Sequence, residues 1–170
     1  MIRRFIREGL TAVTIFSALT RGCVLIFLLA CLSGEGRALP EVEQCTPTPP
    51  DALGPFYKPD APVRSSVGKG YVLNGFVRSS TDCRPIADAR IEFWLAGPDA
   101  EYDDGHRATV HSDRTGRYSF ESNVPPAYAG RPPHIHVRVS VKGFKTLVTQ
   151  HYPAPSQKEA RFDIVLVPAR

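Results

Sequence analysis

Between Arg131 and Val139 the chain reads Arg-Pro-Pro-His-Ile-His-Val-Arg-Val. From His134 to Val141 apolar residues recur at every second position, which is the period of a half-buried β-strand. One face of this strand then carries only apolar residues, and the other face carries His134 and His136 side by side. Two imidazoles at this spacing can bind one metal ion from a rigid support. A polar strand face that happens to hold two histidines explains the pair equally well.

Similar short alternating segments recur along the chain and are separated by turn signals. Turns are indicated at 79–84, at Asp113-Arg114-Thr115-Gly116 and at Lys142-Gly143. No long segment beyond residue 38 shows the 3.6-residue period of an amphipathic helix. We therefore predict an all-β fold, an antiparallel β-sandwich of the immunoglobulin or prealbumin-like kind. The expected strands besides 134–141 are 71–77, 89–94, 117–120, 144–150 and 161–167.

The first 38 residues have the character of an export signal. Three arginines near the start precede apolar residues 10–19 and 23–32, and Arg21 interrupts the apolar run. Gly36-Arg37-Ala38 offers small residues for cleavage before Leu39, which is the interpretation we favour. The alternative is a lipobox at 28–31, which would leave a lipidated Cys31 as a membrane tether. Either route predicts an exported protein, located in the periplasm or outside the cell.

Removing residues 1–38 takes away five Arg and two Glu, which lowers the formal charge from +4 to +1. The basicity therefore belongs mostly to the signal, and no nucleic-acid-binding patch is expected. Residues 39–69 are rich in proline and should form an extended arm, and residues 70–170 should form the sandwich. Cys45 and Cys83 remain in the folded part, and an even pair in an exported protein indicates a disulfide. The alternative is two buried thiols.

Two histidines need further ligands, and two tyrosines are candidates. Tyr128 precedes the histidine strand by a short turn, and Tyr102 lies in the loop after Trp94. A phenolate is a hard anionic oxygen ligand, and together with imidazoles it favours a hard oxidised ion such as ferric iron. Spacing does not establish this set, because a single tyrosine more often packs or lies at the surface. Other candidates, with packing or surface roles as the favoured interpretation, are Tyr118, His106, His111, His151 and Asp103.

From about Leu53 to Val167 the chain resembles the intradiol ring-cleavage dioxygenases, of the protocatechuate and catechol type. The matching pieces are Leu53-Gly54-Pro55-Phe56-Tyr57, Ile91-Glu92-Phe93-Trp94 with Tyr102, Asp113 to Tyr118, Arg131 to His136, and Thr149-Gln150. The resemblance implies a β-sandwich with a non-haem Fe(III) ion. It also implies that Tyr102, Tyr128, His134 and His136 are the metal ligands, that Arg131 is the active-site arginine, and that Gln150 is a polar residue near the substrate.

The activity implied by the resemblance is cleavage of a catechol ring with both atoms of O₂ inserted, giving a muconate-type diacid. The chain is shorter than the larger members of the family. Only Ala129 and Gly130 separate Tyr128 from Arg131, and no helical N-terminal segment is present. The particular catechol and the oligomeric state stay open for this reason. Two other functions also remain: an iron-free sandwich that binds carbohydrate or protein, and a metal hydrolase that uses both histidines with Asp103.

Overall fold

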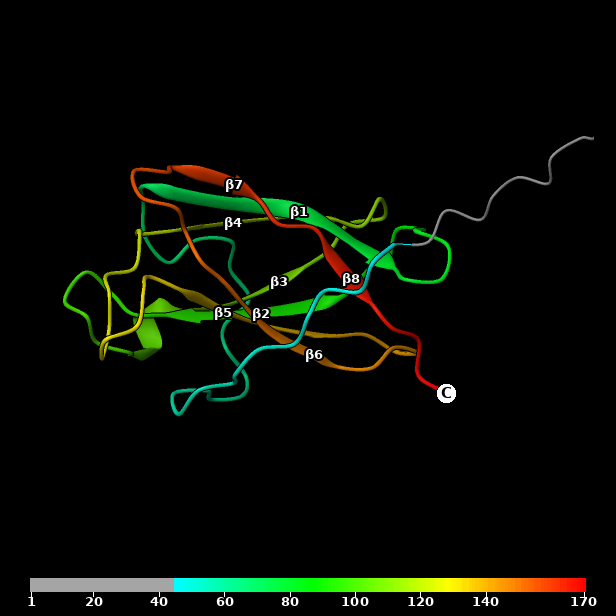
Figure 1. The fold of residues 1–170 in the computed structure, drawn as a ribbon, viewed down its shortest axis with the longest axis horizontal. Coiled ribbons are helices and arrows are strands. Elements are labelled where there is room, and N and C mark those ends of the chain that lie inside the picture. Colours follow the sequence, from blue (N-terminus) through cyan, green and yellow to red (C-terminus); the bar gives the residue numbers. More distant parts are fainter. Residues whose placement is uncertain (1–44) are drawn as a thin grey trace, which may run out of the picture. The chain divides into compact units, whose positions relative to one another are not determined.

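The computed structural model describes residues 45–170, which form two β-sheets packed face to face (Figure 1). One sheet has the order β4-β1-β7, with β8 also pairing with β1, and the other has the order β3-β2-β5-β6. The predicted all-β sandwich is confirmed. The elements are β1 (Tyr71–Ser79), β2 (Arg90–Leu95), the 3₁₀-helix η1 (Asp104–His106), β3 (Arg107–His111), β4 (Arg117–Ser122), β5 (Ile135–Ser140), β6 (Leu147–His151), β7 (Glu159–Arg161) and β8 (Ile164–Leu166).

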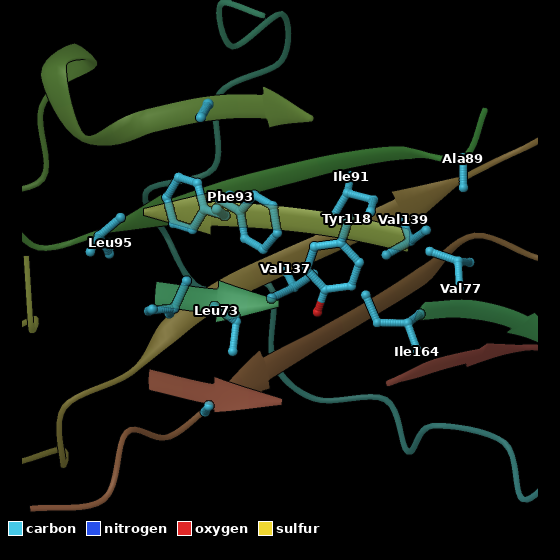
Figure 2. Packing of buried hydrophobic residues seen from close by; sticks show 14 of the residues in the cluster. Leu73, Val77, Ala89, Ile91, Phe93, Leu95, Tyr118, Val137, Val139 and Ile164 are labelled. Carbon is cyan, nitrogen blue, oxygen red and sulfur yellow. The ribbon is translucent and has the colours of Figure 1, made fainter. Parts of the chain in front are cut away.

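The core lies between the two sheets and follows from the period-two alternation of the strands. Along β1 every second residue is buried, because only one face of the strand meets the opposite sheet. Phe93 of β2 stacks on Phe120 of β4, with ring centroids 4.2 Å apart and planes 3° apart. Figure 2 shows Leu73, Val137 and Ile164 in the same layer. Each such side chain contributes about 1.5–3 kcal/mol when it is fully buried.

Strand β5 shows the expected division into two faces. Ile135, Val137 and Val139 are fully buried against the core. His134, just before the strand, and His136 belong to the other face, yet they are only 3% and 2% exposed. That outer face of the sheet is therefore covered by another part of the chain.

The cover is the proline-rich arm, of which residues 45–69 are described. The arm runs extended along β6 (Figure 1), where the Asp51 amide donates to the Val148 carbonyl at 2.9 Å. The Thr149 hydroxyl donates to the Pro49 carbonyl at 2.9 Å. Prolines lack an N–H but keep their carbonyl acceptor, so the arm docks through its carbonyls and through the N–H groups of non-proline residues such as Asp51. The two cysteines predicted to pair, Cys45 and Cys83, are joined in a disulfide at the start of the arm.

Strand β3 was not predicted, since its first residues were interpreted as a loop. Its polar residues are buried by the arm, which hides the usual alternation. The Arg107 guanidinium donates to the Lys58 carbonyl at 2.7 Å, and the Thr109 hydroxyl donates to the Ala61 carbonyl at 2.7 Å. Period-two analysis finds strands with one apolar and one solvated face, and β3 is not such a strand.

The expected single strand 161–167 is in fact two, β7 and β8, and both run parallel to β1 rather than antiparallel. The break occurs at Phe162 and Asp163. There the Asp163 carboxylate accepts the Phe76 amide at 3.0 Å, in place of a backbone carbonyl. The Phe162 carbonyl approaches Gly75 so closely that a Cβ on that glycine would lie 2.2 Å away.

Within residues 45–170, no helix has the length and apolar character needed to cross a membrane. The expected export signal at 1–38, its two processing sites and the first residues of the arm lie outside the described residues.

Candidate metal centre

The four predicted ligands line one cavity of about 330 Å³ at the arm-covered end of β5. This volume is at the lower end of the range for small-molecule sites. The arm contributes two residues, Pro55 and Phe56, and the turn before β5 contributes three, Tyr128, Ala129 and Arg131. The complete lining is Pro55, Phe56, Tyr102, Tyr128, Ala129, Arg131, His134 and His136.

His134 is held in one orientation by the backbone. Its Nδ1 lies 2.7 Å from the Pro132 carbonyl oxygen, so this nitrogen carries a proton and donates. Its Nε2 is then an acceptor, and it lies 3.1 Å from the phenol oxygen of Tyr102. A second partner that fixes the tautomer of an imidazole in this way is usual for metal-binding histidines.

Tyr128 and Arg131 are placed by a tight turn. Their backbones pair through two hydrogen bonds, of 3.2 Å from the Tyr128 amide and 2.8 Å from the Arg131 amide. The two intervening residues, Ala129 and Gly130, have φ of 48° and 75°, as in a type I′ turn. Directly paired residues project to the same side. The turn therefore presents a phenol and a guanidinium together to the cavity.

Aromatic contacts fix the positions of both phenol rings. Phe56 of the arm stacks on Tyr102 with ring centroids 4.3 Å apart. The same ring meets the edge of Tyr128 at 5.5 Å, and the two tyrosines meet edge to face at 5.4 Å. Phe56 thus holds the two predicted tyrosine ligands against each other.

His136 is clamped between β2 and the arm. Its imidazole is stacked on the indole of Trp94, and a Cβ added to Gly54 would lie 2.8 Å from its Cε1. Burial lowers the pKa of His136 to about 4, with a smaller contribution from His134, so the ring is neutral at pH 7. Its Nδ1 is buried and has no hydrogen-bond partner. Trp94 is buried and packs on this outer face of the sheet.

The donor set fits a hard cation. Burial raises the pKa of Tyr102 above its ordinary value, so without a cation the phenol keeps its proton. A bound cation reverses this preference by stabilising the phenolate. Two phenol oxygens and two imidazoles, one with an unpartnered buried nitrogen, are together suited to an oxidised iron ion.

Arg131 contacts Gln150 and Tyr152 rather than the carboxylates of the loop that carries Tyr102. Its Nη2 donates to Gln150 Oε1 at 2.7 Å and to the Tyr152 hydroxyl at 3.1 Å. Asp103 instead accepts from His106, and Asp104 pairs with Arg107. Gln150, which the resemblance placed near the substrate, therefore contacts Arg131 and does not itself line the cavity.

The remaining candidate ligands lie elsewhere. Tyr118 is in the core and its hydroxyl donates to the Phe162 carbonyl at 2.6 Å. His111 pairs with Asp88, and His151 Nε2 lies 2.6 Å from the Tyr71 hydroxyl. Among residues 45–170 no three His, Cys, Asp or Glu side chains are grouped as a metal site. The proposed histidine–aspartate hydrolase site is therefore not formed.

Comparison with known proteins identifies the family to which the chain is related. No family model matches the sequence. Catechol 1,2-dioxygenase of Candida albicans is 35% identical over an alignment of 150 residues, and the match covers 67% of this chain and 50% of that protein. Hydroxyquinol 1,2-dioxygenase of Rhodococcus opacus is 31% identical over an alignment of 146 residues, and the match covers 66% of this chain and 48% of that protein. The chain belongs to the intradiol ring-cleavage dioxygenase family.

Two solved structures are matched over nearly their whole length. The dioxygenase domain of a dioxygenase–carbohydrate-binding protein fusion from Streptomyces sp. SirexAA-E is 28% identical, with a TM-score of 0.64. The match covers 73% of this chain and 100% of that one. An intradiol ring-cleavage dioxygenase from Tetranychus urticae shares the fold, with a TM-score of 0.66 at 16% identity and cover of 74% and 97%. In contrast, the chain spans only about half the length of the two relatives named above.

Two features of the site were not found in the sequence. Phe56 was expected only to pack, yet it lines the cavity, and nothing in the proline-rich arm marks it as part of a site. Tyr152 was not considered, although it follows Gln150 by two residues and so lies on the same strand face. That two-residue spacing was the one sequence signal that could have indicated Tyr152.

Proposed function

We propose that the protein is a non-haem Fe(III) intradiol dioxygenase that cleaves catechol-type rings with O₂ to muconate-type diacids. The observation that carries this proposal is the convergence of two phenols, two imidazoles and one guanidinium on a single cavity. Tyr102, Tyr128, His134 and His136 would hold the iron. Family membership supports the reaction type.

When bound, ferric iron would hold both catechol oxygens and make the ring carbon beside them reactive toward O₂. The chain's own residues do the rest. As a phenolate, the Oη of Tyr102 or Tyr128 would be a base able to take a catechol proton, so no carboxylate base is needed. The Arg131 guanidinium stabilises negative charge that develops on the ring and on oxygen. Pro55 and Phe56 exclude water from one side.

The cavity limits the substrate to a single ring with small substituents on size grounds. An iron-free binding module, the alternative function, has no observation of its own in this structure. The dioxygenase proposal already accounts for the residues that line the cavity.

The test is to load purified protein with iron, add catechol and air, and follow O₂ uptake together with the product. The proposal expects one O₂ consumed for each ring and a muconate-type diacid formed. It fails if the iron-loaded protein takes up no O₂ with any simple catechol, or if the ring opens beside the two hydroxyl groups rather than between them.

We also propose export, by the signal at 1–38. The disulfide Cys45–Cys83 is consistent with an oxidising compartment. The mass of the mature protein separates the two processing routes. A first residue of Leu39 supports ordinary cleavage, and a lipidated Cys31 supports the tether. An unprocessed chain in the cytoplasm contradicts export.

A further inference from the structure

Arg131 reaches the cavity from a turn, so its own backbone does not determine where its guanidinium lies. The long side chain has several free torsions, and holding it in one place needs partners. Both side-chain partners of its Nη2, Gln150 and Tyr152, come from the same face of the β6 segment. Gln150 belongs to the strand, and Tyr152 immediately follows its last residue, His151.

Each of these two partners is itself fixed by the arm. Gln150 Nε2 donates to the Ala52 carbonyl at 2.6 Å, which turns Oε1 of the same amide toward Arg131. The Tyr152 hydroxyl lies 2.9 Å from Asp51 Oδ2. Asp51 in turn is docked by its own amide on the Val148 carbonyl of β6.

The single proton of the Tyr152 hydroxyl has two acceptors within reach, Asp51 Oδ2 at 2.9 Å and Gln150 Oε1 at 3.0 Å. The carboxylate is charged and is the stronger acceptor. When the proton points to Asp51, the oxygen of Tyr152 presents its lone pairs to the donating Nη2 of Arg131. The other oxygen of Asp51 accepts the Ala52 amide at 2.6 Å, so the carboxylate cannot turn away freely.

We propose that Asp51 and Tyr152 are positioning residues that hold the Arg131 guanidinium at the cavity. The proposal rests on the proposed function for its catalytic consequence, but the placement of Arg131 is a property of the protein alone. The arm then has two roles. It closes one side of the cavity with Pro55 and Phe56, and it fixes the position of the active-site arginine through Asp51.

Tyr152→Phe and Asp51→Asn test this in the iron-loaded protein. Tyr152 is 43% exposed, so its hydroxyl can be removed without opening the core. Each change should lower kcat about tenfold with a smaller change in KM, as expected for loss of one charge-assisted hydrogen bond. Iron content should be unchanged, because neither residue lines the cavity.

A double-mutant cycle with Arg131→Ala separates positioning from a general structural effect. If Tyr152 acts through Arg131, Tyr152→Phe should have no further effect on kcat once Arg131 is removed. If the two losses multiply, Tyr152 acts independently of Arg131 and the proposal is overturned.

A second readout needs neither iron nor turnover. In the metal-free protein, the rate at which phenylglyoxal modifies Arg131 is measured by peptide mass spectrometry. Tyr152→Phe and Asp51→Asn should each raise this rate several-fold. Tyr57→Phe is the matched control, since its hydroxyl faces Glu92 at 3.4 Å, and it should leave the rate unchanged.

The two readouts keep the two proposals apart. If the wild-type protein never turns over catechol but Arg131 becomes more reactive in both variants, the proposed function fails and the positioning stands. If Arg131 reacts at the wild-type rate in both variants, the positioning is wrong, whatever the enzyme does.

Discussion

The imidazole of His136 lies flat against the indole of Trp94, with ring centroids 4.8 Å apart and planes 5° apart. Gly54 of the arm is so close to the same imidazole that a methyl group there would overlap it. One cavity-lining side chain is thus held between a sheet residue and a glycine of the arm. The shape of the site depends on both.

Gly54→Ala should therefore impair metal binding. The new Cβ would lie 2.8 Å from His136 Cε1, which forces either the imidazole or the arm to move. We expect the iron bound per chain to fall by about tenfold or more when iron is limiting. Changes to residues that position a metal ligand usually have effects of this size. Metal analysis after gel filtration measures this directly.

The control is Gly143→Ala. Gly54 and Gly143 have φ of 74° and 88°, so alanine is strained at both, but a Cβ at Gly143 has no atom within 4 Å. Both variants should lose about 1 kcal/mol of stability from backbone strain. Only Gly54→Ala should lose iron. Equal loss of iron in the two variants would show that strain, and not contact with His136, is the cause.

Arg131→Ala should keep the iron and lower turnover by about two to three powers of ten, the usual loss for one preorganised group that stabilises developing charge. Arg131→Lys should recover only part of the rate, because a point charge does not reproduce the planar guanidinium. Steady-state rates together with iron content measure both effects. Near-normal turnover in the alanine variant would remove the catalytic role.

The free energy of unfolding should fall in mild acid, in part because acid protonates His151. Burial lowers the pKa of His151 to about 4, from an ordinary value of 6.5. Between these two pKa values the folded chain binds fewer protons than the unfolded chain, so acid favours unfolding. The contribution of His151 to the free energy of unfolding is therefore complete above pH 6.5 and is lost as the pH falls through about 4. Metal-free His136 acts in the same direction.

His151→Gln isolates the first of these contributions. Denaturant unfolding of metal-free protein between pH 7 and pH 4 should show a shallower loss of stability in the variant than in the wild type. Parallel curves would mean that His151 titrates normally in the folded protein.

The disulfide should stabilise the arm as well as the fold. Cys45 and Cys83 are 38 residues apart, and closing a loop of that length is worth roughly 4 kcal/mol in the chain-entropy model. A Cys45→Ser, Cys83→Ser double variant should lose about 2–4 kcal/mol in denaturant unfolding. Equal stability of the variant and the oxidised wild type would contradict this.

The strands with one apolar face could be predicted from the sequence because their alternation records burial on one side only. Strand β3 could not, because the arm buries Arg107 and Thr109 through hydrogen bonds that leave no apolar pattern. The histidine pair could be recognised in the sequence because it alternates with the apolar residues of the strand that bears it. The two tyrosines came from the family resemblance, since each is placed by a loop whose shape has no period.

The arm's share in the site was hidden for a related reason. Extended proline-rich chain has no repeating face, so the sequence does not say that Phe56 would lie against Tyr102 or that Asp51 would meet Tyr152. Such contacts depend on where the arm docks. Its docking is set by hydrogen bonds of its backbone N–H and carbonyl groups and by a disulfide, and not by a periodic pattern of side chains.

The most direct measurement of the central claim is the visible absorption spectrum of the iron-loaded protein and of three tyrosine variants. Tyrosinate bound to ferric iron gives a charge-transfer band and a reddish colour. We predict this band in the wild type and in Tyr118→Phe, whose phenol lies in the core, and its weakening or loss in Tyr102→Phe and Tyr128→Phe. A colourless wild-type protein with iron bound, or a band that survives both site variants and disappears in Tyr118→Phe, would contradict the account.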